Sequence, residues 1–153
     1  MKILNNLEFS AKQILPASDT ETPKCQIYIN ETATDSILQG AILEAAIKYQ
    51  EFYLVFTTND CPYEDTLNIH YLDQDLSILD QATLSWPYGT GSFTLLNSIQ
   101  PNRIRFHFFE PKVWEITLYT KKQFFIPYFS EPRGVWRKFK FNRYFKIGEV
   151  TER

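Results

Sequence analysis

The side chains best suited to catalysis or metal binding are two histidines and two cysteines. The 153 residues contain only His70, His107, Cys25 and Cys61 of these types, and both histidines fall on the outward faces of predicted strands. Cys61 with either histidine would supply a thiol nucleophile with its base, or part of a zinc site. Cys61 lies in an acidic turn, which disfavours a thiolate, and no short-spaced pair such as Cys-x-x-Cys occurs. We therefore expect no metal and no cofactor, and an enzyme using His70 or His107 is our third hypothesis.

Three further patterns in the sequence are explained without a catalytic or ligand-binding role. Carboxylates between Glu64 and Asp80 would suit acid–base catalysis, but acids in loops and at strand ends are normally solvated. Gly89-Thr90-Gly91 lacks the further glycine and the Lys-Ser/Thr of phosphate-binding loops, and it lies between strands instead of opening a helix. We predict a turn there, and two reduced thiols at Cys25 and Cys61.

Charge is distributed unevenly along the chain. Residues 1–120 hold 15 acids and 7 bases, a net charge of −8, whereas residues 121–153 hold 3 acids and 9 bases, a net charge of +6. Segregated charge can steer a charged macromolecule toward one surface. Residues 51–80 contain seven acids and no Lys or Arg, so we predict that these acids form a contact surface for a protein partner. They are Glu51, Asp60, Glu64, Asp65, Asp73, Asp75 and Asp80.

The C-terminal segment mixes cations with aromatic rings. Grooves that bind single-stranded nucleic acids have this composition. An edge strand with Phe139 and Phe141 inward and lysines outward would share it, and the pI of about 5.7 argues against a dedicated nucleic-acid binder. A nucleic acid or anionic ligand is therefore our second hypothesis. Its contact residues would be Arg133, Arg137, Lys138, Lys140, Arg143 and Lys146.

Length and composition predict one domain, residues 1–153, with a sizeable core. The aromatic fraction is 16%, which supplies large apolar side chains for a short chain. The first residues do not resemble a signal peptide, and no stretch approaches the roughly 20 apolar residues of a membrane span. We expect a cytoplasmic protein that does not cross a membrane.

The spacing of apolar residues predicts one amphipathic helix over residues 35–49. Thr34 or Asp35 can cap its N-terminus. The apolar residues that recur at helical spacing are Ile37, Leu38, Ala41, Ile42, Ala45, Ala46 and Tyr49. Such a helix would pack its apolar face against one face of a sheet.

From residue 51 onward the apolar period changes to two, which predicts strands. Residues 52–56 are apolar on both faces, as in a central strand, and residues 66–72 and 103–108 alternate. Short connections favour an antiparallel meander in which Arg105 could pair with Glu115 on the next strand. The predicted fold class is therefore α+β, with about 6–7 antiparallel strands and one main helix.

One stretch resembles a known class of proteins. Tyr-Leu-Asp-Gln-Asp-Leu-Ser-Ile-Leu-Asp-Gln-Ala-Thr-Leu over residues 71–84, followed by Tyr-Gly-Thr-Gly-Ser-Phe over residues 88–93, resembles small cytoplasmic immunity proteins of bacterial toxin–immunity pairs. The length and the aromatic composition are similar too. The resemblance implies a non-enzymatic protein that neutralises a cognate toxin. Our first hypothesis is thus a protein-binding protein that uses the acids of residues 51–80.

Overall fold

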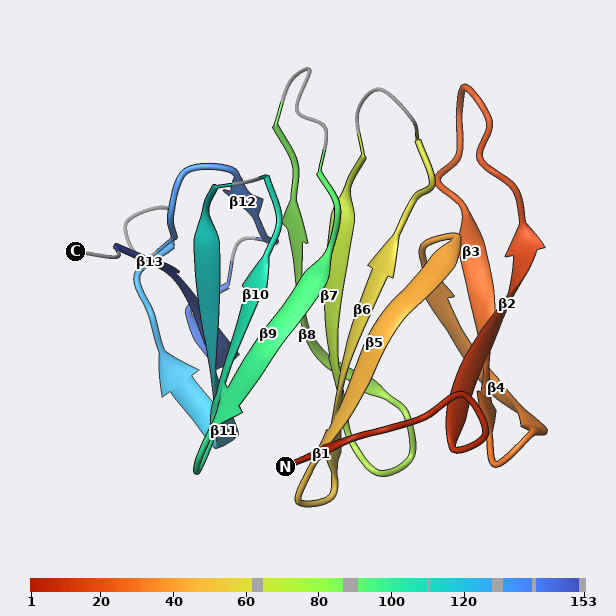
Figure 1. The fold of residues 1–153 in the computed structure, drawn as a ribbon, viewed down its shortest axis with the longest axis horizontal. Helices are drawn as coiled ribbons and strands as arrows, with labels where there is room; N and C mark the ends of the chain where they lie inside the picture. The colour runs from red at the N-terminus through yellow and green to blue at the C-terminus, as the bar shows by residue number, and fades with distance from the viewer. Residues whose placement is uncertain (62–64, 87–90, 110, 128–130, 139, 152–153) are drawn as a thin grey trace.

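The protein is built from β-strands. The computed structural model describes residues 1–61, 65–86, 91–109, 111–127, 131–138 and 140–151. Within these ranges the regular secondary structure consists of β-strands and includes no helix. The strands form three antiparallel sheets, which follow one another along the long axis of the molecule (Figure 1). Within these ranges no helix is long and apolar enough to cross a membrane.

Sheet A lies in the middle, between sheets B and C. Its six strands, in spatial order, are β1 (Lys2–Ile3), β5 (Ile42–Tyr49), β6 (Phe52–Thr58), β7 (Leu67–Leu72), β8 (Ile78–Leu84) and β12 (Val135–Trp136). Sheet B contains β2 (Phe9–Leu15), β3 (Lys24–Ile29) and β4 (Thr32–Gln39). Sheet C contains β13 (Asn142–Val150), β11 (Val113–Phe124), β10 (Arg103–His107) and β9 (Thr94–Ile99).

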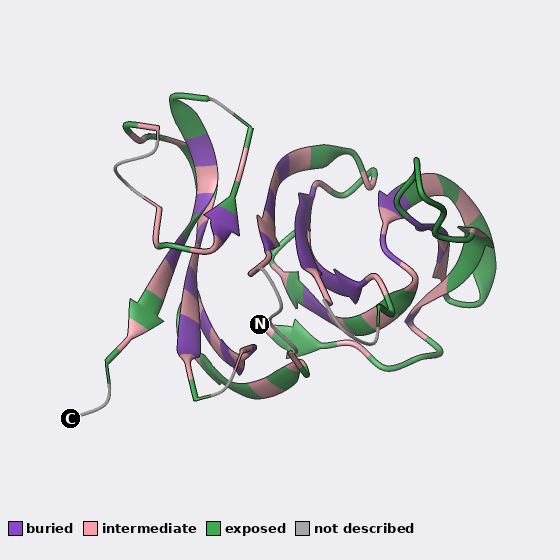
Figure 2. Cartoon of the chain, turned by 90° about the horizontal axis from the view of Figure 1, so that it is seen from above, coloured by how far each residue is buried: buried purple, intermediate pink, exposed green. Residues whose placement is uncertain are grey.

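Sheet A has a hydrophobic core on each face. Leu54 and Phe56 of β6 belong to the cluster that contains Phe106 of sheet C. Val55, between them, belongs to a second cluster with Ile27 of sheet B. Successive side chains of a strand point to opposite faces, which explains why β6 is apolar on both. Figure 2 shows how buried and more exposed residues alternate along many of the strands.

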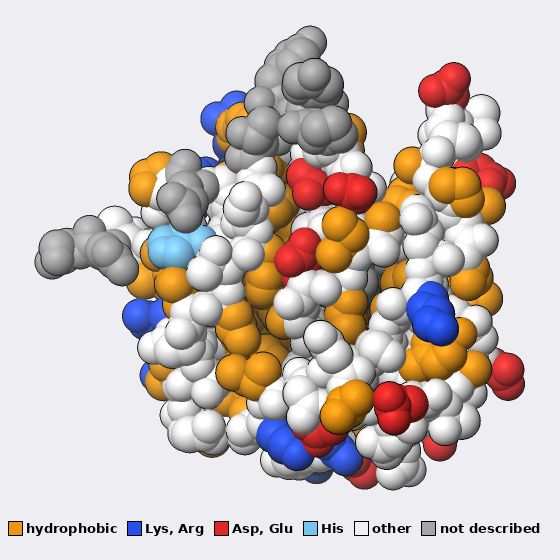
Figure 3. All heavy atoms as spheres, turned by 45° about the vertical axis from the view of Figure 1, so that its right-hand side comes forward, with side chains coloured by type: hydrophobic (Ala, Val, Ile, Leu, Met, Phe, Trp, Pro, Cys, Tyr) orange, Lys and Arg blue, Asp and Glu red, His pale blue; other side chains and the backbone are white. Residues whose placement is uncertain are grey.

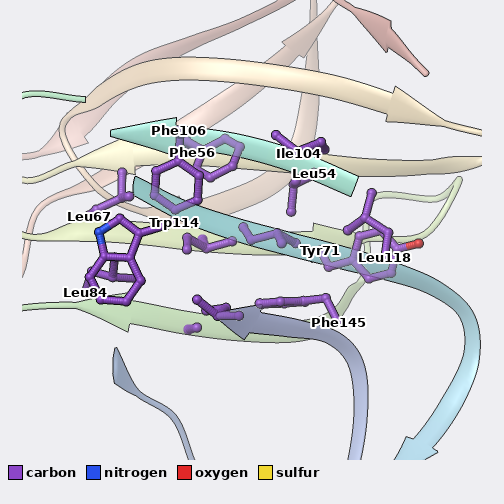
Figure 4. Close-up of a cluster of buried hydrophobic side chains, with 14 of the residues drawn as sticks. Leu54, Phe56, Leu67, Tyr71, Leu84, Ile104, Phe106, Trp114, Leu118 and Phe145 are labelled. Atoms are coloured by element: carbon purple, nitrogen blue, oxygen red, sulfur yellow. The ribbon is translucent and has the colours of Figure 1, made fainter. Parts of the chain in front are cut away.

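Aromatic side chains fill the core between sheets A and C (Figure 4). The ring centroids of Phe56 and Phe106 are 5.2 Å apart, and Tyr71 meets Phe145 edge-on at 6.2 Å. The buried polar atoms of these large side chains are satisfied. The Tyr71 hydroxyl donates to the Tyr119 carbonyl at 2.9 Å, for example. The high aromatic content of the sequence is therefore used mainly for packing.

The predicted helix over residues 35–49 is wrong, and so is the α+β class. These residues form the end of β4 and all of β5, joined by a tight turn at Gly40. Gly40 has φ of +131°, and a Cβ there would lie 2.2 Å from Thr57 Oγ1, so only glycine fits. Ile37 and Ile42 are 50% and 42% exposed instead of facing one core. The apolar residues of two adjacent strands happened to fall at helical spacing.

The strand predictions fared better. Strands were expected at residues 52–56, 66–72 and 103–108, and β6, β7 and β10 occupy these segments. The strands β6 to β8 form the expected meander, and so do β9 to β11, whereas β5 adds a strand where a helix was predicted. Arg105 and Glu115 are direct partners across β10 and β11, with Arg105 Nε donating to Glu115 Oε2 at 2.8 Å. The predicted number of strands is too low because β2, β4, β5 and the two-residue strands β1 and β12 were not expected.

Candidate binding site

The acids predicted as one contact surface lie at separate places. Glu51 follows β5, and Asp73 and Asp75 follow β7, so these three lie at one end of sheet A. Asp60 follows β6 and Asp65 precedes β7, which places both at the opposite end. The length of β6 separates the two ends by about 20 Å. On the face shown in Figure 3, acidic side chains occur in several small groups with Lys and Arg between them.

Asp80 is buried and pairs with two cations of the basic C-terminal segment. Arg137 Nη2 lies 2.5 Å from Asp80 Oδ2, and Arg143 Nη1 lies 3.7 Å from Asp80 Oδ1. The Tyr144 N–H also donates to Asp80 Oδ2 at 2.8 Å, and Arg137 Nη1 contacts Glu131 Oε1 at 3.1 Å. The side chains of Asp80, Arg137 and Arg143 are at most 5% exposed. With Glu131, these charges balance, and the side chains of Asp80, Arg137 and Arg143 are not part of the outer surface.

His70 is buried, not outward-facing, and both of its ring nitrogens have partners. Nδ1 lies 3.0 Å from Gln81 Nε2, and Nε2 lies 3.1 Å from the Gln39 carbonyl and 3.2 Å from Thr57 Oγ1. An amide N–H donates to Nδ1 and a carbonyl accepts from Nε2–H, which is a neutral tautomer. Burial lowers the pKa of His70 to about 4. His70 thus joins strands β4, β6 and β8 as a structural hydrogen-bonding group.

The other chemistry-bearing residues are not brought together. His107 lies in sheet C, where its Nδ1 contacts the Lys112 carbonyl at 3.1 Å, and Cys61 is exposed at the end of sheet A. The described residues contain no group of three or more His, Cys, Asp or Glu side chains able to hold a metal ion. Glu64 and most of the predicted turn at residues 87–91 lie outside the described residues. Both cysteines are free thiols.

Two pockets adjoin strand β12, at the edge of sheet A. The first, the apolar pocket, has a volume of about 520 Å³ and is lined by Trp86, Pro127, Pro132, Val135, Trp136 and Arg133. The second, the polar pocket, has a volume of about 570 Å³, and its lining includes Asn68, His70, Gln81, Thr83, Trp136 and Lys140. Trp136 and Lys138 line both. Volumes of this size are typical of ligand-binding sites.

Trp136 is the exposed aromatic side chain between the two pockets. Strand β12 consists of Val135 and Trp136. Val135 is buried and anchors the strand in the core, while the side chain of Trp136 faces outward. Trp136 is 63% exposed, and its indole Nε1 donates to the Ser85 carbonyl at 3.3 Å. An exposed tryptophan fixed in this way is preorganised for contact with a partner.

A tight turn shapes the apolar pocket. The Val135 N–H donates to the Pro132 carbonyl at 3.2 Å, and Gly134 has φ of +94°, as the third residue of a type II turn requires. A Cβ on Gly134 would lie 3.1 Å from the ring of Trp86, so the chain passes close to this tryptophan. The Arg133 guanidinium lies 4.9 Å from the centroid of the same ring. The segment therefore presents a cation beside two tryptophans.

Some residues of the predicted basic patch are buried and others are exposed. Arg137 and Arg143 are used internally, as described above. Arg133, Lys138 and Lys140 are exposed beside the pockets, and none of the three has an ion-pair partner within the part of the chain that is described. Lys146 is exposed on β13. Trp136 is one of the rings of the basic aromatic segment in the nucleic-acid hypothesis. Trp86 and Asn68 were not expected from the sequence to be site residues.

No family model, no curated protein and no solved structure matches the chain.

Proposed function

We propose that this protein is a non-enzymatic protein-binding protein whose contact surface is centred on Trp136 and the apolar pocket. The observation that carries the proposal is the fixed, 63% exposed indole beside that pocket. Tryptophan and arginine dominate the binding energy of protein interfaces when they lie at an apolar centre. Trp86, Trp136 and Arg133 supply both residue types within one small area.

The charges around the pocket indicate what the partner presents. Arg133 and Lys138 are exposed and lack carboxylate partners within the described ranges. A partner with an apolar side chain flanked by Asp or Glu would fill the pocket and pair these cations. Neutralisation of a toxin stays a hypothesis for the consequence of this binding, and the acidic turns of sheet A are not needed for it.

The protein-binding proposal is favoured over nucleic-acid binding because of how the cations are distributed. Arg137 and Arg143 pair with Asp80 inside the protein. The exposed cations that remain are Arg133, Lys138 and Lys140 around β12 and Lys146 on β13. A strand of nucleic acid requires a continuous basic groove. We propose a non-enzymatic role because both ring nitrogens of His70, which lines the polar pocket, already have hydrogen-bond partners within the protein.

The test uses the product of the neighbouring gene as the candidate partner. We expect Trp136→Ala to weaken the complex at least about tenfold in a titration or native mass measurement, as loss of an interface hot spot does. Ile14→Ala is the matched control, because Ile14 is similarly exposed at 48% but lies in sheet B. Both variants should keep the thermal stability of the parent protein. Equal weakening by both variants, or by neither, would contradict the assignment of this surface.

A further inference from the structure

The polar pocket differs from the apolar pocket because polar side chains of strands β7 and β8 line it. Asn68 is the register partner of Thr83, and Thr83 is the register partner of Trp136. His70 and Gln81 form the next such pair toward the other end of β7. Directly opposed residues share a face of the sheet. The pocket is therefore built on ordered rows of hydrogen-bonding groups that end at an exposed aromatic ring.

Hydrogen bonds within the pocket leave one buried acceptor without a donor. The nitrogens of His70 are occupied, and Asn68 Nδ2 donates to Asn59 Oδ1 at 2.8 Å. Asn68 Oδ1 is buried and has no partner in the described structure, although Asn68 is only 2% exposed. Buried polar atoms of this kind are normally paired. Asn68 lines the polar pocket, and a turn of its amide about the last torsion, which is broad for Asn, is needed to present this oxygen to a donor there.

The charge at the mouth of the pocket is positive. The one carboxylate that lines it, Asp80, is neutralised by Arg137 and Arg143, and His70 is uncharged near neutral pH. Lys138 and Lys140 are exposed there and have no ion-pair partner among the residues described. Two exposed ammonium groups attract an anionic group such as a carboxylate.

The spacing of these groups limits the size of a ligand. Trp136 and Asn68 are separated by β8, so their backbones are about 10 Å apart across the sheet. A single six-membered sugar ring fits this span. It would lay its apolar face on the indole, direct hydroxyl groups toward the amide oxygens, and leave an acidic substituent at the lysines.

We propose that the polar pocket is a binding site for an acidic monosaccharide unit of the uronic acid type. The ligand's hydroxyl groups donate to Asn68 Oδ1 and exchange hydrogen bonds with Thr83 and Gln81. Its carboxylate pairs with Lys138 and Lys140, and one face of its ring packs on Trp136. The two sites share Trp136 and Lys138, which line both pockets. The sugar site does not rest on the proposed protein partner, because Asn68, Thr83 and Lys140 line the polar pocket and not the apolar one.

Binding is measured on the full chain with D-glucuronate, and with D-glucose and acetate as probes of the separate ligand parts. The readout is the ¹H–¹⁵N signal of the Trp136 indole, assigned with Trp136→Phe. We expect a saturable shift with D-glucuronate and an affinity for D-glucose that is at least about tenfold weaker. Acetate should give no saturable shift. No saturation with glucuronate, or equal affinity for glucose, would overturn the proposal. Equal affinity for acetate would show a site for a small anion only and would also overturn it.

Variants assign the interactions to residues. Lys138→Met with Lys140→Met should reduce the affinity for glucuronate to that for glucose, and Asn68→Leu should weaken it about tenfold. Thr83→Val removes the hydroxyl group of the residue opposite Asn68. It tests the hydrogen-bonding claim even if Asn68→Leu does not fold. Arg133→Met, which changes only the apolar pocket, should leave glucuronate affinity unchanged but weaken the protein partner. Unaltered glucuronate affinity in the lysine variant, or in Thr83→Val, would overturn the assignment.

Discussion

Asp80 and Arg137, 57 residues apart in the chain, are joined inside the protein by a contact of 2.5 Å between Oδ2 and Nη2. This pair connects β8 to the residue that follows β12, and it holds the Trp136 segment against the edge of sheet A. The network also includes Arg143 and Glu131, so two acids face two bases. Its buried charges are balanced, which is the condition for retaining them in an interior.

The first prediction concerns this network. Asp80→Asn keeps the shape of the side chain but leaves Arg137 and Arg143 without their shared carboxylate. We expect the free energy of unfolding to fall by about 3–5 kcal/mol, the cost of breaking a buried ion pair by removing one partner. Urea unfolding followed by tryptophan fluorescence measures the change.

Glu115→Gln provides the control for the Asp80 prediction. Glu115 pairs with Arg105, but the two side chains are 19% and 34% exposed. Loss of this partly solvated pair should cost about 1 kcal/mol or less. If Asp80→Asn costs no more than Glu115→Gln, the buried network does not hold the segment in place.

The second prediction is a loss of stability in mild acid that depends on His70. Burial lowers the pKa of His70 from 6.5 to about 4 in the folded protein. As pH falls below 6.5, the histidine of the unfolded chain binds a proton, whereas buried His70 stays neutral until about pH 4. The stability associated with neutral His70 is therefore complete above pH 6.5 and is lost as pH falls toward 4. The loss is up to roughly 3 kcal/mol. Urea unfolding across this pH range measures it.

His70→Gln should remove that part of the pH dependence, because glutamine does not titrate. Carboxylates elsewhere titrate equally in both proteins, so the difference between the two curves isolates His70. Identical slopes for His70→Gln and the parent would show that His70 is not the titrating group.

The third prediction concerns the turn between β4 and β5. Gly40→Ala forces a side chain into a positive φ and onto Thr57, and we expect a loss of about 2–4 kcal/mol in unfolding free energy. Gly148→Ala is the control, because a Cβ at Gly148 meets no atom within 4 Å. Thermal unfolding of both variants measures the effect. A melting temperature for Gly40→Ala equal to that of Gly148→Ala would contradict the described turn.

The fourth prediction separates the two thiols. Cys25 is buried in sheet B, and desolvation raises its pKa to about 11, whereas Cys61 is exposed. Only the thiolate reacts with alkylating or disulfide reagents. We expect one thiol to react in the native protein and two in urea, and Cys61→Ser to abolish the native reaction. Fast native labelling of the Cys61→Ser protein would contradict the burial of Cys25.

Strands with a clear two-residue period were predictable from the sequence. Ile104 and Phe106 face the core as their alternation indicated, because one face of sheet C is buried and the other is not. The helix prediction is wrong because the helical spacing of apolar residues runs across Gly40, a residue that is unfavourable within a helix by about 1 kcal/mol. Spacing alone does not distinguish one helix from two short strands when a glycine lies between them.

The charge pattern did not predict a surface, for a topological reason. Successive turns of an antiparallel meander lie at opposite ends of the sheet. Acids that follow one another in the chain, such as Asp60 and Asp73, therefore separate in space. Asp80 was counted with them, yet its position within β8 places it inside the protein. The candidate pockets depend on β12, whose two residues give no periodic signal.

The two-sided packing of sheet A makes the N-terminal segment indispensable. Val55 and Leu72 are fully shielded from water only because Phe9, Ile27 and Leu38 lie over them. A shortened chain that began after Gly40 would retain every buried residue of the opposite core but would present a bare apolar layer to solvent. Such a fragment would self-associate instead of persisting as a monomer.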